Sequence, residues 1–188
     1  MFERCQEAAQ WMAAFEGKWF IAGGWAIDLH IGEETRQHQD IEVAIFRDDQ
    51  SLLKETMSGW EVHVIENHQL REWNQLEQLE MPVHEIHAKM DVQELEILLN
   101  ERDGDRWVFR RDPEITFPIS HMHLHSEQGF PYLNPEIVLL YKAKETKQKD
   151  DQDFENIFPR LNERQKEWLK QGLIQCHPNH PWLEKLLL

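Results

Sequence analysis

Two short groups of residues in this chain could do chemistry together: the glycine pair Gly23-Gly24 and the carboxylate pair Asp40 and Glu42. Backbone N–H groups at a glycine turn that leads into a helix, together with the positive end of the helix dipole, bind phosphate. Carboxylate oxygens hold Mg²⁺, which usually shares its coordination shell with substrate phosphates. Together the two groups predict a metal-assisted site for nucleotidyl transfer.

The segment 40–46 must hold the carboxylates in a fixed direction, and it reads as a β-strand. Because side chains alternate along a strand, Asp40 and Glu42 project from one face and their apolar neighbours from the other. Each group alone also has a plainer explanation, since a glycine pair often forms a simple turn and alternating acids often line a solvated face. The residues between the two groups therefore decide the interpretation.

The run from Gly23 to Glu42 resembles the signature of the aminoglycoside and lincosamide nucleotidyltransferases, members of the polymerase-β-like nucleotidyltransferase superfamily. The resemblance joins the glycine pair, Trp25, Asp28, the Thr-Arg-x-His run at 35–38 and the carboxylate pair in the same order. Close relatives usually carry Asp at the position of Glu42, although the wider superfamily tolerates Glu. Metal geometry and rate are the properties that this longer side chain would change.

Further blocks of the resemblance, within residues 131–144, 149–154 and 177–183, extend it over nearly the whole chain. It implies an α+β fold in which a polymerase-β-like nucleotidyltransferase core with a mixed sheet is followed by a C-terminal helical bundle. We predict the α/β core at residues 1–128 and the helical subdomain at residues 129–188. The resemblance also implies Mg²⁺, with two ions expected, and ATP or another nucleoside triphosphate as co-substrate.

A two-metal site needs a third acidic side chain, and strand parity selects Glu96. Apolar residues alternate with acidic ones along the segment 94–99, so Glu94 and Glu96 should share the sheet face of the carboxylate pair. Glu96 lies nearer the strand centre, where relatives place an acid just before an Asp-Gly-Asp-x-Trp hairpin. We predict it as the third metal ligand or the general base. Glu94 is the alternative, and an exposed strand glutamate is the plain explanation.

Five residues are predicted to bind the triphosphate. Gly23 and Gly24 allow the backbone to approach it, and Trp25 opens the helix whose N–H groups face it. Arg36 is a candidate for neutralising phosphate charge, although a surface or carboxylate-orienting role fits equally well. Lys142 is the candidate from the helical half, against the alternative of a solvated lysine.

Four other polar residues receive supporting roles. Asp28 is predicted to be structural, because it lies one turn into the helix that follows the glycines. His38 could position the metal ligands, although a loop histidine without a catalytic role is favoured. We expect Glu136 and Asp153 to orient basic residues or to cap helices.

The run His121-Met122-His123-Leu124-His125 invites a zinc interpretation. Alternation would place its three histidines on one strand face, as a ligand set requires. No cysteine or acid at ligand spacing completes the set. We therefore favour a polar, exposed strand edge.

Composition limits the partners. Acidic residues outnumber basic ones 35 to 20 and the net charge is −15, which argues against a nucleic-acid partner because phosphate neutralisation needs clustered Lys and Arg. An acidic surface favours a cationic small acceptor, as aminoglycosides are. No apolar run approaches the roughly 18 residues of a membrane span, and the N-terminal residues do not read as a secretory signal. We expect a cytoplasmic protein with no membrane partner, in which Cys5 and Cys176 are reduced. The oligomeric state is left open.

The remaining pattern assigns most elements and leaves residues 67–92 without an assignment, because they are polar and mixed in period. Expected strands and helices alternate in the first part of the chain, a hairpin turn falls at 103–105, and helices alone follow residue 135. The expected strands are 18–22, 40–46, 60–64, 95–99 and 106–110; the expected helices are 2–16, 25–31, one starting at 48, 136–144, 151–159, 162–175 and a short one after 181.

The leading hypothesis is metal-dependent transfer of a nucleoside monophosphate, AMP from ATP by preference, to a hydroxyl of an aminoglycoside- or lincosamide-like small molecule. Such a reaction is typical of antibiotic-resistance enzymes. A catalytically weak nucleotide-binding homologue is the first alternative, and Glu42 in place of Asp motivates it. The second is a protein-modifying nucleotidyltransferase of the toxin–antitoxin kind, suggested only by small size. The sequence leaves the acceptor and the nucleotide base open.

Overall fold

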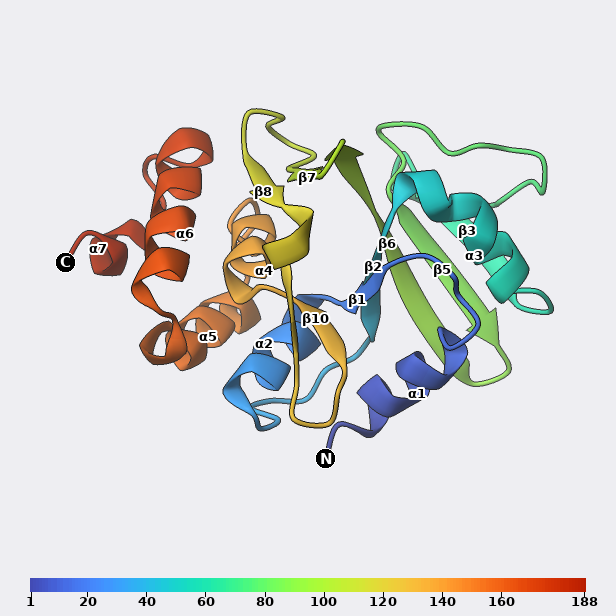
Figure 1. Cartoon of the computed structure of the whole chain (residues 1–188), viewed down its shortest axis with the longest axis horizontal. Helices are drawn as coiled ribbons and strands as arrows, with labels where there is room; N and C mark the ends of the chain where they lie inside the picture. Colours follow the sequence, from blue (N-terminus) through green and yellow to red (C-terminus); the bar gives the residue numbers. More distant parts are fainter.

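A twisted mixed sheet runs through the centre of the protein, and a group of helices covers one end of it (Figure 1). The computed structural model describes residues 1–188. The main path of the sheet has the order β4 (Gln69–Glu72), β3 (Glu61–Glu66), β5 (Glu85–Met90), β6 (Gln93–Asp103), β2 (Glu42–Phe46), β1 (Trp19–Ile21), β10 (Pro131–Leu133) and β9 (His123–His125).

The helices form two sets. In the first part of the chain lie α1 (Glu3–Trp11), α2 (Gly23–Ile31), the 3₁₀ turn η1 (Arg47–Asp49) and α3 (Gln50–Thr56). The second set consists of α4 (Pro135–Lys142), α5 (Gln148–Ile157), η3 (Phe158–Arg160), α6 (Glu163–Cys176) and α7 (Leu183–Leu186). Both α4 and α5 pack against α2, so the second set is joined to the core through the helix that follows the glycines. No helix has the length and apolar character needed to cross a bilayer.

Strand pairing at the middle of the sheet determines which of the candidate residues lie opposite one another. β2 runs parallel to β6, with Glu42 opposite Glu96, and antiparallel to β1 on its other side. β5 pairs antiparallel with β6, which brings His87 opposite Glu96. The buried apolar side chains of β6 are Leu95, Ile97 and Leu99, as the alternation predicts, and Asn100 beside them is buried as well. The α+β fold with a mixed sheet and C-terminal helices is confirmed.

The predicted hairpin at 103–105 is confirmed. β6 turns into β7 (Arg106–Val108), with Asp103 opposite Arg106 and Gly104 at φ +57, a left-handed conformation that glycine adopts without strain. β7 pairs in turn with β8 (Thr116–Pro118). Trp107, in β7, is fully buried and donates from Nε1 to the Asn100 side-chain oxygen at 2.9 Å.

Several expected boundaries are wrong. The first helix ends at Trp11, and β2 begins at Glu42, so Asp40 lies in the segment that enters the strand. The unassigned residues 67–92 contain β4 and β5. Residues 119–121 form the 3₁₀ turn η2 (Ile119–His121), so His121 does not share a strand with His123 and His125. The division at residue 128 remains a prediction, and β10, which follows it, pairs with β1 inside the sheet.

Candidate active site

The glycine turn at the start of α2 is required by close approach of other groups. Gly23 has φ +60, and a Cβ atom added there would collide with the carboxylate of Glu42. A Cβ atom at Gly24 would collide with the guanidinium of Arg36 and the ring of His38. Only glycine allows the N-terminal turn of α2 to pack directly against the carboxylate strand and the loop before it.

The three predicted acidic residues come from neighbouring parts of the sheet, but their carboxylate oxygens do not all lie within 4.8 Å of one another; Glu96 forms such a group with Glu85 and His87 instead. Glu42 heads β2 beside Glu96 in the adjacent parallel strand. Asp40 is exposed just before β2 and lines a shallow hollow together with Glu96. Glu42 lines a separate cavity on the side of α4. The carboxylates therefore lie at the junction of two concave surfaces.

Burial and mutual repulsion act on these carboxyl groups. Burial raises the pKa of Glu42; the positive charges of Lys142 and Lys149 oppose this rise, and the negative charges of Glu85 and Asp40 add to it. Burial, followed by the charge of Glu42, raises the pKa of Glu96 to about 7. Such a group of acids favours a bound cation.

Glu94, the alternative third acid, faces a different environment. It is exposed and forms an ion pair with Lys89 at 3.1 Å, across the β5–β6 ladder. Glu96 is more buried and pairs in register with Glu42. The geometry therefore favours Glu96 over Glu94 as the third metal ligand or general base.

Sequence reasoning missed a histidine at this site. His87 Nε2 lies 2.7 Å from Glu85 Oε1 and 3.8 Å from Glu96 Oε1, and one ligand atom from each residue falls within a 4.8 Å group. An imidazole and two carboxylates form a set that divalent transition metals accept. The alternation Glu85-Ile86-His87-Ala88 was the available signal, and it lies in the segment that received no assignment.

A buried aspartate holds the loop before the carboxylates. Asp28 is fully buried and accepts hydrogen bonds from Thr35 Oγ1 at 2.6 Å and, on its other oxygen, pairs with His38 Nε2 at 2.6 Å. The His38 ring lies 4.4 Å from that of Trp25, and Trp25 donates from Nε1 to the Asp40 carbonyl at 3.1 Å. These side chains orient the Asp40 backbone, and the Trp25 side chain supports the loop that leads into β2.

The two predicted cations share one buried partner. Arg36 donates to both oxygens of Asp153 at 2.7 and 2.9 Å, and Lys142 lies 3.1 Å from the same carboxylate. Lys142 also bonds Asp150 at 2.6 Å. Asp153 is fully buried, so it fixes both positive charges near the first turn of α2. This agrees with the expected orienting role of Asp153.

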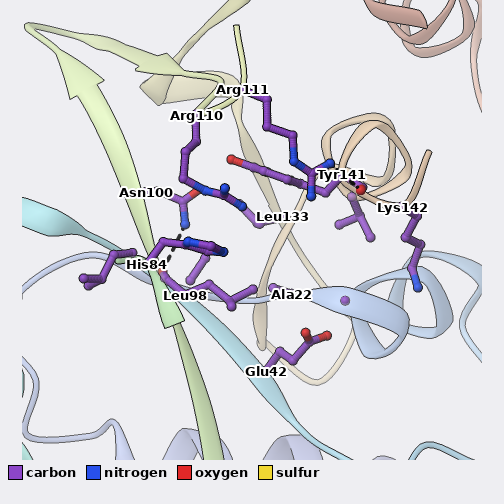
Figure 2. A pocket seen from close by; sticks show the side chains of 14 residues that line it. Ala22, Glu42, His84, Leu98, Asn100, Arg110, Arg111, Leu133, Tyr141 and Lys142 are labelled. Atoms are coloured by element: carbon purple, nitrogen blue, oxygen red, sulfur yellow. Dashed lines mark hydrogen bonds between the residues drawn. The ribbon is translucent and has the colours of Figure 1, made fainter. Parts of the chain in front are cut away.

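A cavity of about 250 Å³ opens beside Glu42, between the sheet, the β7–β8 hairpin region and α4 (Figure 2). Apolar walls come from β2, β6, β10 and α4, and polar groups come from Arg110, Arg111, Tyr141 and Lys142. It adjoins a wider cleft of about 700 Å³ that is lined further out by Lys144, Lys147 and Lys149. The two spaces share Glu42, His84, Arg111, Tyr141 and Lys142. A nucleotide and a second substrate could approach Glu42 from these spaces.

Comparison with known proteins gives the family. The model of the aminoglycoside-2''-adenylyltransferase family matches residues 6–128, the larger part of the chain and the part that holds all three acids. The chain belongs to this family. It is thereby a member of a nucleotidyltransferase family of antibiotic adenylyltransferases. A search of curated protein sequences found no match.

Solved structures share the fold at low sequence identity. The solution structure of the antibiotic-resistance factor ANT(2'')-Ia is 16% identical with a TM-score of 0.62, and 93% of each chain is covered. ANT(2'')-Ia in complex with adenylyl-2''-tobramycin is 14% identical with a TM-score of 0.62, covering 92% of this chain and 98% of that one. The lincomycin-bound lincosamide adenylyltransferase LnuA is 16% identical with a TM-score of 0.59, covering 83% and 96%. At these identities the likeness establishes the fold.

Proposed function

We propose that this protein transfers AMP from ATP to a hydroxyl group of a small molecule. The observation that carries the proposal is the in-register pair Glu42 and Glu96 beside a glycine turn whose backbone packs against Glu42. Family membership supports the reaction class. Aminoglycosides and lincosamides are the first acceptors to test, because relatives are named for them.

In the proposed reaction the acceptor oxygen forms a bond to the α-phosphorus of ATP. The bond from that phosphorus to the bridging oxygen breaks, and pyrophosphate leaves. Glu96 accepts the hydroxyl proton. The N–H groups at Gly23 and Gly24 hold the triphosphate, with the positive charges of Arg36 and Lys142 nearby.

The residues fit a hard divalent cation. Burial and close approach leave Glu42 and Glu96 with raised pKa values, and neither carboxylate has a lysine or arginine ion pair. Asp40 and Glu42 would hold Mg²⁺ through oxygen atoms, the ligands that it prefers, and Glu96 would be the third ligand where it does not act as the base. When bound, Mg²⁺ neutralises charge on the attacking and leaving oxygens.

The direct test is an assay with ATP and Mg²⁺ across aminoglycosides, lincosamides and other polyols, following pyrophosphate release and the mass of the modified acceptor. Asp40→Ala should lower turnover by more than about a hundredfold, since loss of even an outer partner of a metal ligand costs up to that much. Glu127→Ala, in the exposed turn between β9 and β10, is the matched control and should retain full turnover. Unchanged turnover in Asp40→Ala would refute the assignment.

Two further measurements distinguish the proposed function from the two alternatives. Calorimetric binding of ATP without pyrophosphate release from any acceptor would favour the nucleotide-binding homologue. Labelled AMP appearing on a protein in lysate, with none on small molecules, would favour the protein-modifying enzyme.

A further inference from the structure

The cavity beside Glu42 has a charge opposite to that of the molecule. The chain carries a net charge of −15, yet Arg110, Arg111 and Lys142 line this cavity and Glu42 is its one carboxylate. Figure 2 shows the two arginines entering from one wall, with Glu42 on the opposite wall and Lys142 to the side. A ligand of this cavity therefore meets a local field that the overall charge does not predict.

Arg110 has no partner inside the protein. Its guanidinium forms no ion pair and no side-chain hydrogen bond, and lies 5.7 Å from the centre of the Tyr141 ring. Burial lowers the pKa of Arg110, the direction expected for a charge without full compensation. A half-buried guanidinium whose donors are unpaired is costly unless a ligand supplies an acceptor.

Arg111, at the mouth of the cavity, has one hydrogen bond to a carbonyl group and, like Arg110, no ion pair. It donates from Nη1 to the Tyr141 carbonyl at 2.8 Å and lies 5.3 Å from the Tyr141 ring centre, without a carboxylate partner. Other arginines near the site are paired. Arg36 bonds Asp153 at 2.7 Å, and Arg47 bonds Glu101 at 2.7 Å. The protein therefore neutralises its supporting arginines and leaves two uncompensated at the cavity.

The rest of the cavity wall is fixed. Asn100 is buried, accepts from Trp107 Nε1 at 2.9 Å and donates to the Leu98 carbonyl at 3.1 Å. Leu98 and Leu133 contribute apolar surface, and Tyr141 provides an aromatic one. The volume of about 250 Å³ is below the roughly 300–1,000 Å³ of sites for drug-sized ligands. A small molecule with an apolar or ring face suits this space.

We propose that the acceptor is a small hydroxyl-bearing anion whose carboxylate or phosphate group is bound by Arg110 and Arg111, with its body against Tyr141 and its hydroxyl toward Glu42. This inference rests on the proposed AMP transfer and names the class of its acceptor. Arginine matches such groups because its planar fork binds carboxylate and phosphate with two parallel hydrogen bonds. A polycationic acceptor would be repelled by the same pair.

The triphosphate of ATP is the other source of an anion near Glu42. It has its own cations, because four lysines line the wider cleft: Lys142, Lys144, Lys147 and Lys149. Arg111 lines both this cleft and the cavity, whereas Arg110 lines the cavity alone. We therefore assign Arg110, with Arg111 at the mouth, to the acceptor, and the experiment below separates the two sources.

The test measures binding without ATP, by calorimetry on the full chain. Glycerol 3-phosphate, glucose 6-phosphate and gluconate are the anionic probes; glycerol and glucose are their neutral counterparts, and kanamycin is the cationic probe. At least one anion should bind about tenfold more tightly than its neutral counterpart and than kanamycin, and added salt should weaken it. Equal binding of charged and neutral probes would overturn the proposal.

Variants locate the bound group. Arg110→Gln and Arg111→Gln should each lower the affinity for the anionic probe by about tenfold or more, as expected for the loss of hydrogen bonds to a charged group. Arg106→Gln is the matched control, because Arg106 is exposed on β7 and donates to Thr116 at 2.8 Å, and it should leave binding unchanged. Weaker ATP binding with unchanged probe binding would assign the arginines to the nucleotide and overturn the proposal. If a variant does not fold, the wild-type probe comparison still decides.

Failure of this inference and failure of the proposed function give different results. Anion binding that persists in Asp40→Ala, with no AMP transfer to any acceptor, would remove the proposed function and leave the anion site standing. AMP transfer to kanamycin without any anion binding would overturn the anion site and leave the transferase standing.

Discussion

At the scale of single residues, Glu96 is the carboxylate on which the proposed chemistry depends most. Glu96→Gln should reduce pyrophosphate release by more than about a hundredfold and leave the fold intact, because the side chain lies off the core face and Gln keeps its shape. Glu94→Gln, on the same strand and paired with Lys89, is the control and should keep full activity. Full activity of Glu96→Gln would move the role to Glu94.

The same residues predict how the fold responds to metal. Mg²⁺ should raise the unfolding temperature of the wild type, because a ligand that binds only the folded state stabilises it, by about 2.7 kcal/mol at a hundred times its Kd. Asp40→Ala should show a much smaller rise, since one of the oxygen ligands is gone. Thermal melts with EDTA and with increasing Mg²⁺ measure both. An equal rise in the two proteins would place the metal elsewhere.

At the scale of elements, Asp153 of α5 joins three parts of the chain. It holds Arg36 from the loop before β2 and Lys142 from the end of α4, and it is fully buried. Asp153→Asn should lower the free energy of unfolding by about 3 kcal/mol or more, the range for removing one partner of a buried ion pair. Denaturation in urea measures this. Glu155→Gln, on the same helix but exposed, is the control and should change stability by less than about 1 kcal/mol.

The regularity of the local sequence pattern explains which strands and helices could be predicted. Local rules found β2, β6, the 103–105 turn and the helices of the second half, because each has a clear period or a glycine turn. They failed at β5, because its short alternation lies inside residues 67–92, a segment that is polar and mixed in period. They also failed at His121, where the chain enters a 3₁₀ turn that sequence alternation cannot reveal.

At the scale of the whole molecule, acid should loosen the contact between α4 and α5. Burial acts to raise the pKa of Asp150, but the hydrogen bonds from Lys142 and the Lys147 backbone outweigh it and hold this pKa below its usual range. A depressed carboxyl pKa adds stability above the unfolded pKa, about 3.9, and that stability is lost as pH falls through the folded value. Asp150→Asn should therefore reduce the loss of stability between about pH 4 and pH 2. Denaturation at fixed pH values measures it, and an unchanged slope would contradict it.

The overall charge is a second property of the whole molecule, and it does not describe the charge of the cavity beside Glu42. A net charge of −15 favours cationic partners, yet the cavity beside Glu42 is lined by Arg110, Arg111 and Lys142. Net charge sums the whole surface, whereas a ligand responds to the few groups that line its site.

The sequence by itself determined the glycine turn, the carboxylate pair and the parity that turns Glu96 away from the core, because these depend on short-range geometry and a period of two residues. Only the tertiary structure decided that Glu42 pairs with Glu96, that His87 joins them and that Asp153 anchors two cations. These contacts join residues far apart in the chain, and their pairing follows from the burial of whole strands and helices. The same long-range packing decides that some arginines pair with a carboxylate whereas others line the cavity without one.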